Sequence, residues 1–363
     1  MKILFLSSHA HLVLDETSTL TSGGAELQVA LLARELAAQG HEVVVAGGDT
    51  GQEDGTKLQG VRVRNAGKFH TGRLAEMIAA IPRVARVLRE EKPDWVVVMG
   101  WTAWLFVLWA LRPFFRYKLD FICALDTEVN GEYRREHPLF GALFEFALRR
   151  CDARHAITRE QVAHYRRRGM EATLYRYLIF PRSGPVVGAK DVDFLWVSRC
   201  MPIKRPDLFL DLAAALPASS FRMICPAQDR DLWDNISRRA ADLPNVELIE
   251  SVPYHRVQDY YDRARVFVNT STWEGWPNSF IQAGLGRAAL LSLDVNPDDI
   301  FGDFGPGVYA AGDFAVLVAA ARRMMEDVSA LEAMQAGCER FVVEMHDNAK
   351  ETGAFLRGLE VIP

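Results

Sequence analysis

The residues best suited to chemistry lie in one stretch, from Thr270 to Ala283. Glu274 places a carboxylate in a polar loop that follows an apolar strand, and Pro277 then opens a helix. Proline suits the first helical position, because its missing N–H would have no partner there. The next N–H groups, at 278–280, are expected to point out of the helix end, where the dipole favours an anion.

Asn278 and Gln282 are four residues apart, so they share one face of that helix. We expect this face to turn toward the same cleft as Glu274. A carboxylate, an amide and an open helix start would then meet at the carboxyl edge of a sheet. This combination suits a ligand in which a sugar is attached to a phosphate. The predicted binding residues are Pro277, Asn278, Ser279 and Gln282.

Two cations that follow another strand are suited to stabilising the phosphate. Arg199 and Lys204 come after the apolar run 194–198 and lie five residues apart. A departing phosphate gathers negative charge on its oxygens, and a guanidinium and an ammonium would hold that charge. The alternative is that both are ordinary surface charges. No Asp-x-Asp pair lies in a suitable loop, and with two cations available no metal ion or other cofactor is predicted.

Four segments together resemble the retaining family 4 glycosyltransferases. The stretch around Glu274 resembles the Glu-x7-Glu signature of that family, with Gln282 in place of the second glutamate. The other segments are Ser22–Glu26, Ser198–Pro206 and the stretch 244–254. None of them is specific alone, but four in the expected order are, and they cover nearly the whole chain.

The resemblance implies a fold and an activity. The fold is GT-B, an α/β architecture of two Rossmann-like domains whose parallel sheets face a central cleft, with a C-terminal helix that crosses back to the first domain. The activity is the transfer of a sugar from a nucleotide-diphosphate sugar, with retention of configuration and without a metal. In this family Glu274 would orient the donor sugar through its hydroxyls. The alternatives are a role as nucleophile and a role as an N-cap-like carboxylate that stabilises the helix at Pro277.

Two positions depart from the family pattern. In the family the position of Gln282 holds the ribose hydroxyls. A charged hydrogen bond contributes roughly 1.5–3 kcal/mol and a neutral one about 0.5–1.5, so the glutamine would weaken donor binding by on the order of 1 kcal/mol. Many members also carry a histidine at the end of a strand in the first domain. The run 121–126 ends in Leu125-Asp126 instead, and Asp126 is the candidate to replace it.

Three more residues of the second half are assigned from the resemblance. Ser251 and Val252 are expected to lie beside the nucleotide base and to contact it through backbone groups. For Trp276 two interpretations remain open, because its ring either packs against the sugar or fills space.

The first half has its own candidate loops. Gly23 and Gly24 would let the backbone approach the diphosphate closely, just before a helix. Glu26, in the first turn of that helix, is interpreted as a partner of the helix dipole. His9 and His11 are interpreted as residues of an ordinary polar loop.

Strand-like runs alternate with helical patterns, which predicts parallel sheets built from βαβ units. Strands are expected at 3–7, 42–46, 61–63, 95–99, 120–124, 153–157 and 172–178, and then at 194–198, 221–226, 246–249, 266–269, 289–292 and 307–309. A segment rich in Pro, Gly and Ser at 181–188 predicts the linker. The expected domains are an acceptor-side domain at 1–182, a nucleotide-sugar domain at 183–345 and a C-terminal helix at 346–363.

Composition restricts the class of protein. The chain has 363 residues, of which 49% are hydrophobic and 25% charged, as is usual for a globular protein of two domains. The long apolar run 95–111 is interpreted as a buried strand and helix and not as a membrane span. Five cysteines without Cys-x-x-Cys spacing argue against a disulfide framework or a zinc site and favour a reducing cytoplasm.

The net charge of −5 hides an asymmetry between the two halves. Residues 1–185 contain 25 Lys and Arg against 21 Asp and Glu, and the remainder contains 17 against 26. In the basic half, the aromatic residues at 114, 115 and 117 lie beside Arg116 and Lys118. Two interpretations remain open: a solvated helix face, or a surface that rests on an anionic membrane. The basic excess is small and no nucleic-acid motif accompanies it, so no nucleic-acid partner is predicted.

These features predict a cytoplasmic, hexosyltransferase-like enzyme. It would move a sugar from a nucleotide sugar to a glycan or lipid-linked acceptor, in the biosynthesis of a cell-surface polysaccharide or glycolipid. Under the second interpretation of the basic surface, the enzyme would be peripheral on the inner face of the membrane. The alternatives are a GT-B enzyme that epimerises or hydrolyses nucleotide sugars, and a non-catalytic scaffold that binds them.

Overall fold

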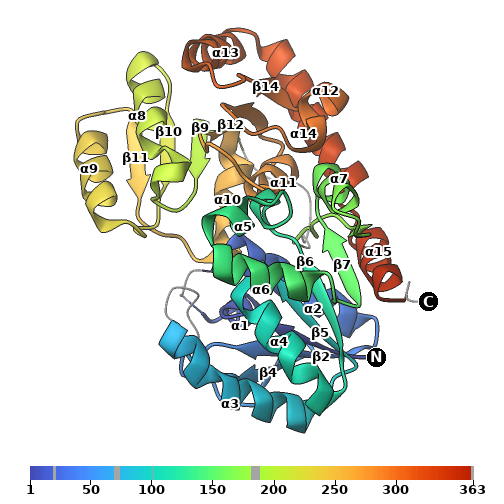
Figure 1. Cartoon of the computed structure of the whole chain (residues 1–363). Helices are drawn as coiled ribbons and strands as arrows, with labels where there is room; N and C mark the ends of the chain where they lie inside the picture. The colour runs from blue at the N-terminus through green and yellow to red at the C-terminus, as the bar shows by residue number, and fades with distance from the viewer. Residues whose placement is uncertain (19–21, 69–73, 101, 181–188, 361–363) are drawn as a thin grey trace. The chain divides into compact units, whose positions relative to one another are not determined.

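The computed structural model describes residues 1–18, 22–68, 74–100, 102–180 and 189–360 (Figure 1). The chain forms two compact units, the first made of Met1–Phe180 with Asp347–Pro363 and the second of Pro181–His346. The linker expected at 181–188 lies outside the described residues. Each unit contains one sheet with helices packed against it, so the predicted α/β class with two Rossmann-like domains is confirmed.

The sheet of the first unit has eight strands in the order β3-β4-β2-β1-β5-β6-β7-β8. They are β1 (Lys2–Leu6), β2 (Glu42–Gly47), β3 (Lys57–Leu58), β4 (Val61–Asn65), β5 (Trp95–Met99), β6 (Lys118–Ile122), β7 (Ala153–Ala156) and β8 (Thr173–Leu174). All neighbours are parallel except β3 and β4. The central strands are continuous apolar runs because they are covered on both faces, as β5 shows with every residue buried.

The helices of the first unit are α1 (Ala10–Leu14), α2 (Gly24–Ala38), α3 (Leu74–Glu91), α4 (Thr102–Phe115), α5 (Glu132–Glu136), α6 (Pro138–Leu148), α7 (Arg159–Arg167) and α15 (Asn348–Glu360). Side chains of β1 alternate between the two faces of the sheet. Leu4 and Leu6 belong to the core that α3, α4 and α6 cover. On the opposite face the ring of Phe5 stacks on Phe355 of α15, with the ring centroids 6.4 Å apart.

The C-terminal helix α15 therefore packs on the first unit, through a buried polar contact. His155 of β7 and Asp120 of β6 are both fully buried, and the His155 Nδ1 lies 2.9 Å from the Asp120 Oδ1. The His155 Nε2 lies 3.1 Å from the main-chain oxygen of Phe355. Gly358 allows this approach, because a Cβ there would lie 2.2 Å from the His155 Nε2.

The same helix explains why one predicted strand is wrong. The expected strand at 172–178 is only the two residues of β8. Beyond it, side chains take the backbone N–H groups that a neighbouring strand would have used. The N–H of Arg176 donates to Glu351 at 2.6 Å, and that of Leu178 donates to Gln28 at 2.7 Å. The strand expected at 120–124 likewise begins and ends two residues earlier, as β6.

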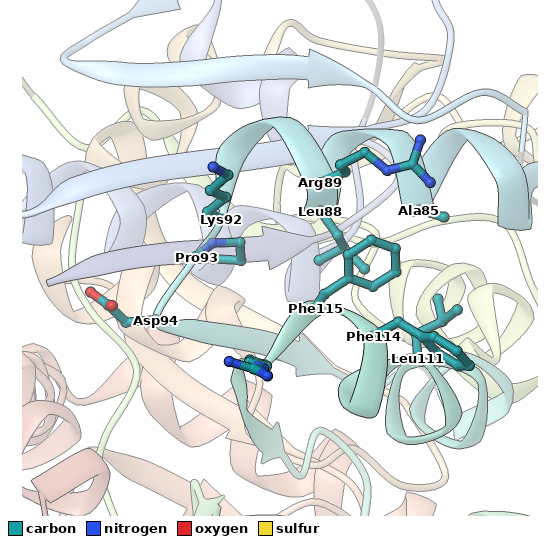
Figure 2. A pocket seen from close by; sticks show the side chains of 10 residues that line it. Ala85, Leu88, Arg89, Lys92, Pro93, Asp94, Leu111, Phe114 and Phe115 are labelled. Carbon is teal, nitrogen blue, oxygen red and sulfur yellow. The ribbon is translucent and has the colours of Figure 1, made fainter.

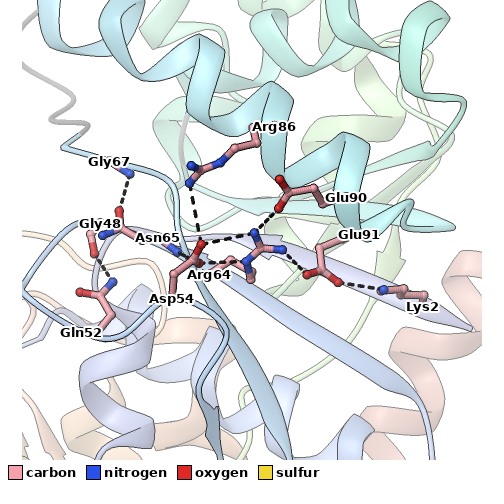
Figure 3. A network of polar contacts seen from close by, with 10 residues as sticks. All are labelled: Lys2, Gly48, Gln52, Asp54, Arg64, Asn65, Gly67, Arg86, Glu90 and Glu91. Carbon is pink, nitrogen blue, oxygen red and sulfur yellow. Dashed lines mark hydrogen bonds and ion pairs between the residues drawn. The ribbon is translucent and has the colours of Figure 1, made fainter.

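A polar network fastens β4 to α3 and β1 (Figure 3). The guanidinium of Arg64 contacts the carboxylates of Asp54, Glu90 and Glu91. Glu91 also accepts from the ammonium of Lys2 at 2.8 Å. Burial would raise the pKa of Glu91, but the hydrogen bonds from Lys2 and Arg64 outweigh it and the pKa is lowered. The cations thus keep a buried carboxylate ionised.

The sheet of the second unit has six parallel strands in the order β11-β10-β9-β12-β13-β14. They are β9 (Val192–Val197), β10 (Phe221–Ile224), β11 (Val246–Ile249), β12 (Ala264–Asn269), β13 (Ala289–Ser292) and β14 (Gly307–Tyr309). Each lies within two residues of its predicted position.

The helices of the second unit are α8 (Pro206–Ala215), α9 (Arg230–Ala241), α10 (Tyr254–Arg263), α11 (Asn278–Leu285), α12 (Ile300–Phe304), α13 (Phe314–Glu326) and α14 (Val328–Met345), with 3₁₀ turns η2 (Pro202–Lys204) and η3 (Pro297–Asp299). Trp196 of β9 packs against Phe209 of α8 on one face. Phe267 of β12 packs against Tyr261 of α10 and Phe280 of α11 on the other.

The interpretation of the apolar run 95–111 as a strand and a helix is confirmed by β5 and α4. Across the described part of the chain, no helix combines the length and apolar character needed to span a membrane. All five cysteines are buried free thiols. One part of the predicted aromatic surface is wrong: Tyr117 is buried, and its hydroxyl donates to the Leu108 carbonyl at 2.6 Å.

Candidate active site

The order of strands in the second unit creates a natural binding place at one edge of its sheet. From β9 the chain adds β10 and β11 on one side, and then returns to add β12, β13 and β14 on the other. In parallel α/β sheets, ligands bind at the carboxyl ends of the strands where this reversal occurs. Here the reversal lies between β9 and β12, the strands that precede Lys204 and Glu274.

Lys204 and Glu274 meet at this reversal although they are seventy residues apart in the sequence. The Lys204 Nζ lies 2.7 Å from the Glu274 Oε1, and the two side chains are only 15% and 19% exposed. Glu274 also accepts from the Ser271 hydroxyl at 2.7 Å. Lys204 is therefore not an ordinary surface charge, and its ammonium keeps two further N–H donors for a ligand.

A set of hydrogen bonds fixes the two segments that carry this pair. The Thr270 Oγ1 lies 2.7 Å from the Lys204 carbonyl and accepts from the Trp196 indole at 2.9 Å. The N–H of Thr272 donates to the Ile203 carbonyl at 2.9 Å. These bonds hold the turn η2 against the loop that follows β12, so the positions of both charged groups are set before any ligand binds.

Arg205 adds a second clamp that the sequence analysis did not identify. Its guanidinium donates to the carbonyls of Thr270 and Ser271, at 2.6 and 3.2 Å, and forms an ion pair with Asp294. Its backbone adopts a left-handed conformation, with φ of 46°. Arg205 is thus a positioning residue beside Lys204. Its residue type gives no hint of this, because the partners are carbonyls of a distant loop.

Arg199, the other predicted phosphate ligand, follows β9 by two residues and has an exposed side chain. It makes no hydrogen bond or ion pair with any residue in the described ranges. Its interpretation as a surface charge therefore stays open, alongside its assignment as a phosphate ligand.

The helix after Glu274 begins one residue later than predicted. Helix α11 starts at Asn278, and Pro277 is its N-cap, with extended backbone at φ −70° and ψ 114°. The prediction that the Phe280 N–H points outward is wrong, because it donates to the Pro277 carbonyl at 3.0 Å. Asn278 and Ser279 are half-buried in the first turn. The helix start is therefore tighter than expected, and the Phe280 N–H is not among the groups that could meet an anion.

Gln282 lies where α11 meets the start of α10. Its side-chain amide donates to the Tyr254 hydroxyl at 3.5 Å, and Gln258 donates to its backbone carbonyl at 3.1 Å. Tyr254 follows closely on Ser251, which is exposed, and Val252, which is half-buried. The structure therefore brings the predicted ribose residue next to the predicted base-contacting segment. Tyr254 was quoted for the resemblance but given no role.

The two tryptophans of this loop have different surroundings. Trp276 is 4% exposed, and its ring packs against His346 with the centroids 5.1 Å apart. Of the two interpretations of Trp276, this burial favours space filling. Trp273 is 40% exposed and directly precedes Glu274, and the sequence analysis gave it no role.

In the first unit, the predicted glycine loop lies at the start of α2. Gly23 is the N-cap and Gly24 the first helical residue, one position earlier than expected. The carboxylate of Glu26 folds back over this end: a Cβ on Gly23 would lie 2.4 Å from the Glu26 Oε2. This position agrees with Glu26 as a partner of the helix dipole. It also places a negative charge where a phosphate would approach the helix.

Asp126 follows β6 at the start of the 3₁₀ turn η1 (Asp126–Glu128) and accepts from the Gln161 amide at 3.0 Å. Glu128, two residues on, is 5% exposed and accepts from the N–H groups of Ala124 and Leu125, at 2.8 and 3.2 Å. Burial raises the pKa of Glu128 to about 7, against the lowering effect of those two hydrogen bonds. The carboxyl edge of this sheet thus holds a half-buried carboxylate and a buried carboxyl group that titrates near neutrality.

The interpretation of His9 and His11 as an ordinary polar loop is wrong for His11. It lies in the short helix α1, is 2% exposed, and its Nε2 is 2.8 Å from the Thr50 hydroxyl. Burial, together with the charge of the nearby His9, lowers the pKa of His11 to about 4. The imidazole is therefore neutral at neutral pH. Among the described residues, no three His, Cys, Asp or Glu side chains are grouped as a metal site requires.

Two family models match the chain. The model described as glycosyl transferase 4-like domain matches residues 23–179, and the model described as glycosyl transferases group 1 matches residues 191–327. A search of curated proteins yields no match.

Solved structures are similar over the whole length at low identity. Sucrose-phosphate synthase from Thermosynechococcus elongatus has a TM-score of 0.78 and 15% identity, with 99% of each chain covered. Trehalose-6-phosphate synthase OtsA has a TM-score of 0.76 and 12% identity, with 100% of each covered. WaaG, a glycosyltransferase involved in lipopolysaccharide biosynthesis, has a TM-score of 0.70 and 15% identity, with 99% of each chain covered. At this identity the likeness shows the fold, while the two family models identify the class. The chain belongs to the family 4 glycosyltransferases with the GT-B fold.

Proposed function

We propose that this glycosyltransferase is a retaining, metal-independent enzyme that takes its sugar from a nucleotide-diphosphate sugar. The observation that carries the proposal is the contact between Lys204 and Glu274 at the strand reversal of the second unit. Lys204 supplies a cation for the departing phosphate, and Glu274 supplies a carboxylate for the hydroxyls of the sugar. The phosphate and the sugar are the two groups joined by the bond that breaks.

Each group has one task in this mechanism. Lys204 and Arg199 stabilise the charge that grows on the β-phosphate as the sugar–phosphate bond lengthens. Glu274 orients the sugar ring, and the first turn of α11, at Asn278 and Ser279, donates N–H groups to the diphosphate. Because cations and N–H groups supply the charge stabilisation, the reaction requires no divalent ion in this mechanism.

The remaining contacts hold the nucleotide and the acceptor. Gln282 binds the ribose through a neutral amide, and Ser251 and Val252 lie along the base. On the acceptor side, Asp126 replaces the family's histidine and the Gly23-Gly24 loop approaches the diphosphate. The acceptor is a glycan or a lipid-linked sugar in the synthesis of a surface polysaccharide or glycolipid, which the enzyme meets at the cytoplasmic face of a membrane.

The proposal is tested by thermal unfolding in the presence of UDP, GDP and ADP and their sugars. The matching nucleotide should raise the melting temperature by several degrees at a ligand concentration of about a hundred Kd, because it binds only the folded state. Lys204→Ala should abolish most of this rise, and Lys350→Ala, an exposed lysine, should leave it unchanged. No rise with any nucleotide would contradict the proposal.

Product analysis then separates the activities. With the nucleotide sugar identified, release of the free sugar without an acceptor indicates a hydrolase, and interconversion of the donor indicates an epimerase. Binding without turnover, in the presence of cell-envelope acceptors, indicates a scaffold. Transfer to an added acceptor with retained configuration, in the presence of a chelator, is the expected result.

A further inference from the structure

The first unit has an open hollow at the amino edge of its sheet, away from the strand ends that carry the candidate active site (Figure 2). Its volume is about 650 Å³, within the range of small-ligand sites. It lies where α3 and α4 end and where β5 begins. The lining is apolar at its centre and carries charged side chains, and it comprises Ala85, Leu88, Arg89, Lys92, Pro93, Asp94, Leu111, Phe114, Phe115 and Arg116.

Three cations surround this hollow without partners. Arg89, Lys92 and Arg116 are exposed, and their side chains make no hydrogen bond or ion pair within the part of the chain that the structure describes. The single acidic group in the lining, Asp94, accepts from the backbone N–H of Lys2 at 2.7 Å. The hollow therefore has an excess of positive charge that the protein itself does not neutralise.

Other arginines of the basic half are engaged. Arg112 pairs with Asp152 at 2.6 Å, and both Arg149 and Arg168 contact Glu145, at 3.1 and 2.7 Å. These three arginines of the basic half are therefore held by acidic side chains of the protein. The cations of the hollow have no such partner among the described residues.

Two of these cations are the residues that close α3 and α4. Lys92 and Arg116 have φ of 47° and 57°, a left-handed conformation in which a residue other than glycine, asparagine or aspartate is uncommon. Arg205 and Arg287 adopt the same conformation, but each has an ion-pair partner, Asp294 and Glu339. At the hollow this conformation caps the two helices, since the N–H of Lys92 donates to the Leu88 carbonyl and that of Arg116 to the Arg112 carbonyl. Both cationic side chains therefore start from fixed helix ends and have no partner in the described protein.

The apolar part of the hollow is also exposed. Phe114 is 77% exposed, the highest value among the large hydrophobic side chains described. Figure 2 shows its ring beside Leu111, with Phe115 turned toward Leu88 and the Arg89 side chain alongside. A ligand of anionic charge alone would leave this phenylalanine without a function. An amphiphile satisfies both parts, since its anionic group meets the cations and its apolar part meets Phe114.

We propose that this hollow binds the headgroup of an anionic phospholipid at a bilayer surface, with Phe114 inserted among the acyl chains. The site is separate from the nucleotide-sugar residues of the second unit, and lipid binding requires no sugar transfer. It assigns the membrane contact of the first unit to three cations and one aromatic ring, and not to the basic segment as a whole.

The test is co-sedimentation of the full chain with vesicles of phosphatidylcholine alone and of phosphatidylcholine mixed with phosphatidylglycerol. The test variant is Arg89→Gln with Lys92→Asn and Arg116→Asn, because asparagine tolerates the left-handed conformation. The control variant is Lys57→Gln with Arg62→Gln and Arg323→Gln, which removes three exposed cations elsewhere. A second pair compares Phe114→Ser with Val316→Ser, a 44% exposed valine of α13. Circular dichroism confirms that each variant is folded.

The wild type should bind the mixed vesicles and not phosphatidylcholine alone. The triple test variant should bind roughly a hundredfold more weakly, at about fivefold per cation, and Phe114→Ser at least tenfold more weakly. Both controls should stay within about twofold of the wild type. Thermal shifts by nucleotides should be unchanged in the test variants, so failure here and failure of the proposed function are distinguishable.

Three results would overturn the proposal. One is that the wild type does not bind the mixed vesicles. Another is that the control triple loses as much binding as the test triple, which would show a diffuse charge effect. The third is that an excess of soluble glycerol phosphate at constant ionic strength displaces the wild type from the vesicles while Phe114→Ser binds normally, which would indicate a site for a free anion.

Discussion

The carboxyl edges of the two sheets can be compared directly, because both sheets reverse their strand order beside their first strand, at β1 and β5 in one and at β9 and β12 in the other. At the second reversal, Lys204 and Glu274 are charged groups in contact. After β1 in the first unit comes His11, which is buried and whose pKa is lowered to about 4. Beside its reversal the second sheet therefore has a cation in contact with a carboxylate, while the first sheet has a buried, neutral imidazole after β1.

This difference shows what a shared topology does and does not determine. Topology decides that loops from distant parts of the sequence meet at one edge of a sheet. The side chains decide what that edge can hold, and only the second unit places a cation and a carboxylate there in mutual contact. In the first unit, three cations whose side chains have no partner among the described residues lie at the opposite edge, around the hollow beside Phe114.

The largest expected effect comes from removing the carboxylate that contacts Lys204 at the strand reversal of the second unit. Glu274→Ala should lower kcat by roughly a hundredfold or more, because the hydroxyls of the donor sugar lose the group that orients them. Binding of the nucleoside diphosphate should persist, since Lys204 and Arg199 remain. Initial rates and titration with the nucleotide measure the two effects separately.

The matched control for this change is Glu332→Ala, which removes an exposed carboxylate of α14. It should leave both quantities unchanged. Full activity of Glu274→Ala would show that the carboxylate at the carboxyl edge of the second sheet is not needed for the reaction.

The buried His11 of the first unit predicts that the stability of the protein depends on pH. The folded state depresses the pKa of His11 from 6.5 to about 4, so the unfolded chain takes up the proton first as the pH falls. The contribution of His11 to the free energy of unfolding is therefore complete above pH 6.5 and is lost between that pH and about 4. Between pH 6.5 and about 4, the free energy of unfolding of the wild type should fall by up to about 3 kcal/mol relative to that of His11→Gln.

Urea unfolding at a series of pH values measures this difference. His255→Gln, an exposed histidine of α10, is the control and should follow the wild type at each pH. A constant difference between the wild type and His11→Gln from pH 7 to 4 would show that the imidazole is not buried in its neutral form.

The smallest expected effect concerns the side-chain amide of Gln282 in α11. Gln282→Glu should tighten nucleotide binding by about 1 kcal/mol, because a carboxylate accepts the ribose hydroxyls more strongly than an amide does. Calorimetric titration with the preferred nucleoside diphosphate measures the change. A marked loss of affinity would instead show that the contact with Tyr254 requires the amide as donor.

Much of this molecule could be predicted from local patterns. The strand Trp95–Met99 is a continuous apolar run, and Val246–Ile249 and Ala289–Ser292 are apolar except for Glu247 and Ser292. All three lie where the sequence places them. The motif around Glu274 predicted the strand, the loop and the helix in their order. Its two errors, the position of Pro277 and the outward N–H expected of Phe280, have one cause. Proline is compatible with both the N-cap and the first helical turn, and here it is the N-cap.

Contacts between distant segments could not be predicted in this way. Arg205 and Glu128 have roles that depend on carbonyl and N–H groups whose positions no local pattern specifies. The two-residue β8 replaced a longer predicted strand because Glu351 and Gln28 take its N–H groups. Tyr117, expected on the surface, is buried because its hydroxyl finds a partner in α4.

The sequence by itself determined the α/β class, the order of nearly all the strands and the residues that mark the glycosyltransferase motif, because hydrophobic periodicity and helix-end chemistry act over a few neighbouring residues. Only the tertiary structure decided which charges meet. It joined Lys204 to Glu274, neutralised His11 and left Arg89, Lys92 and Arg116 without partners, because burial and pairing depend on groups that the folding of the chain brings together from far apart.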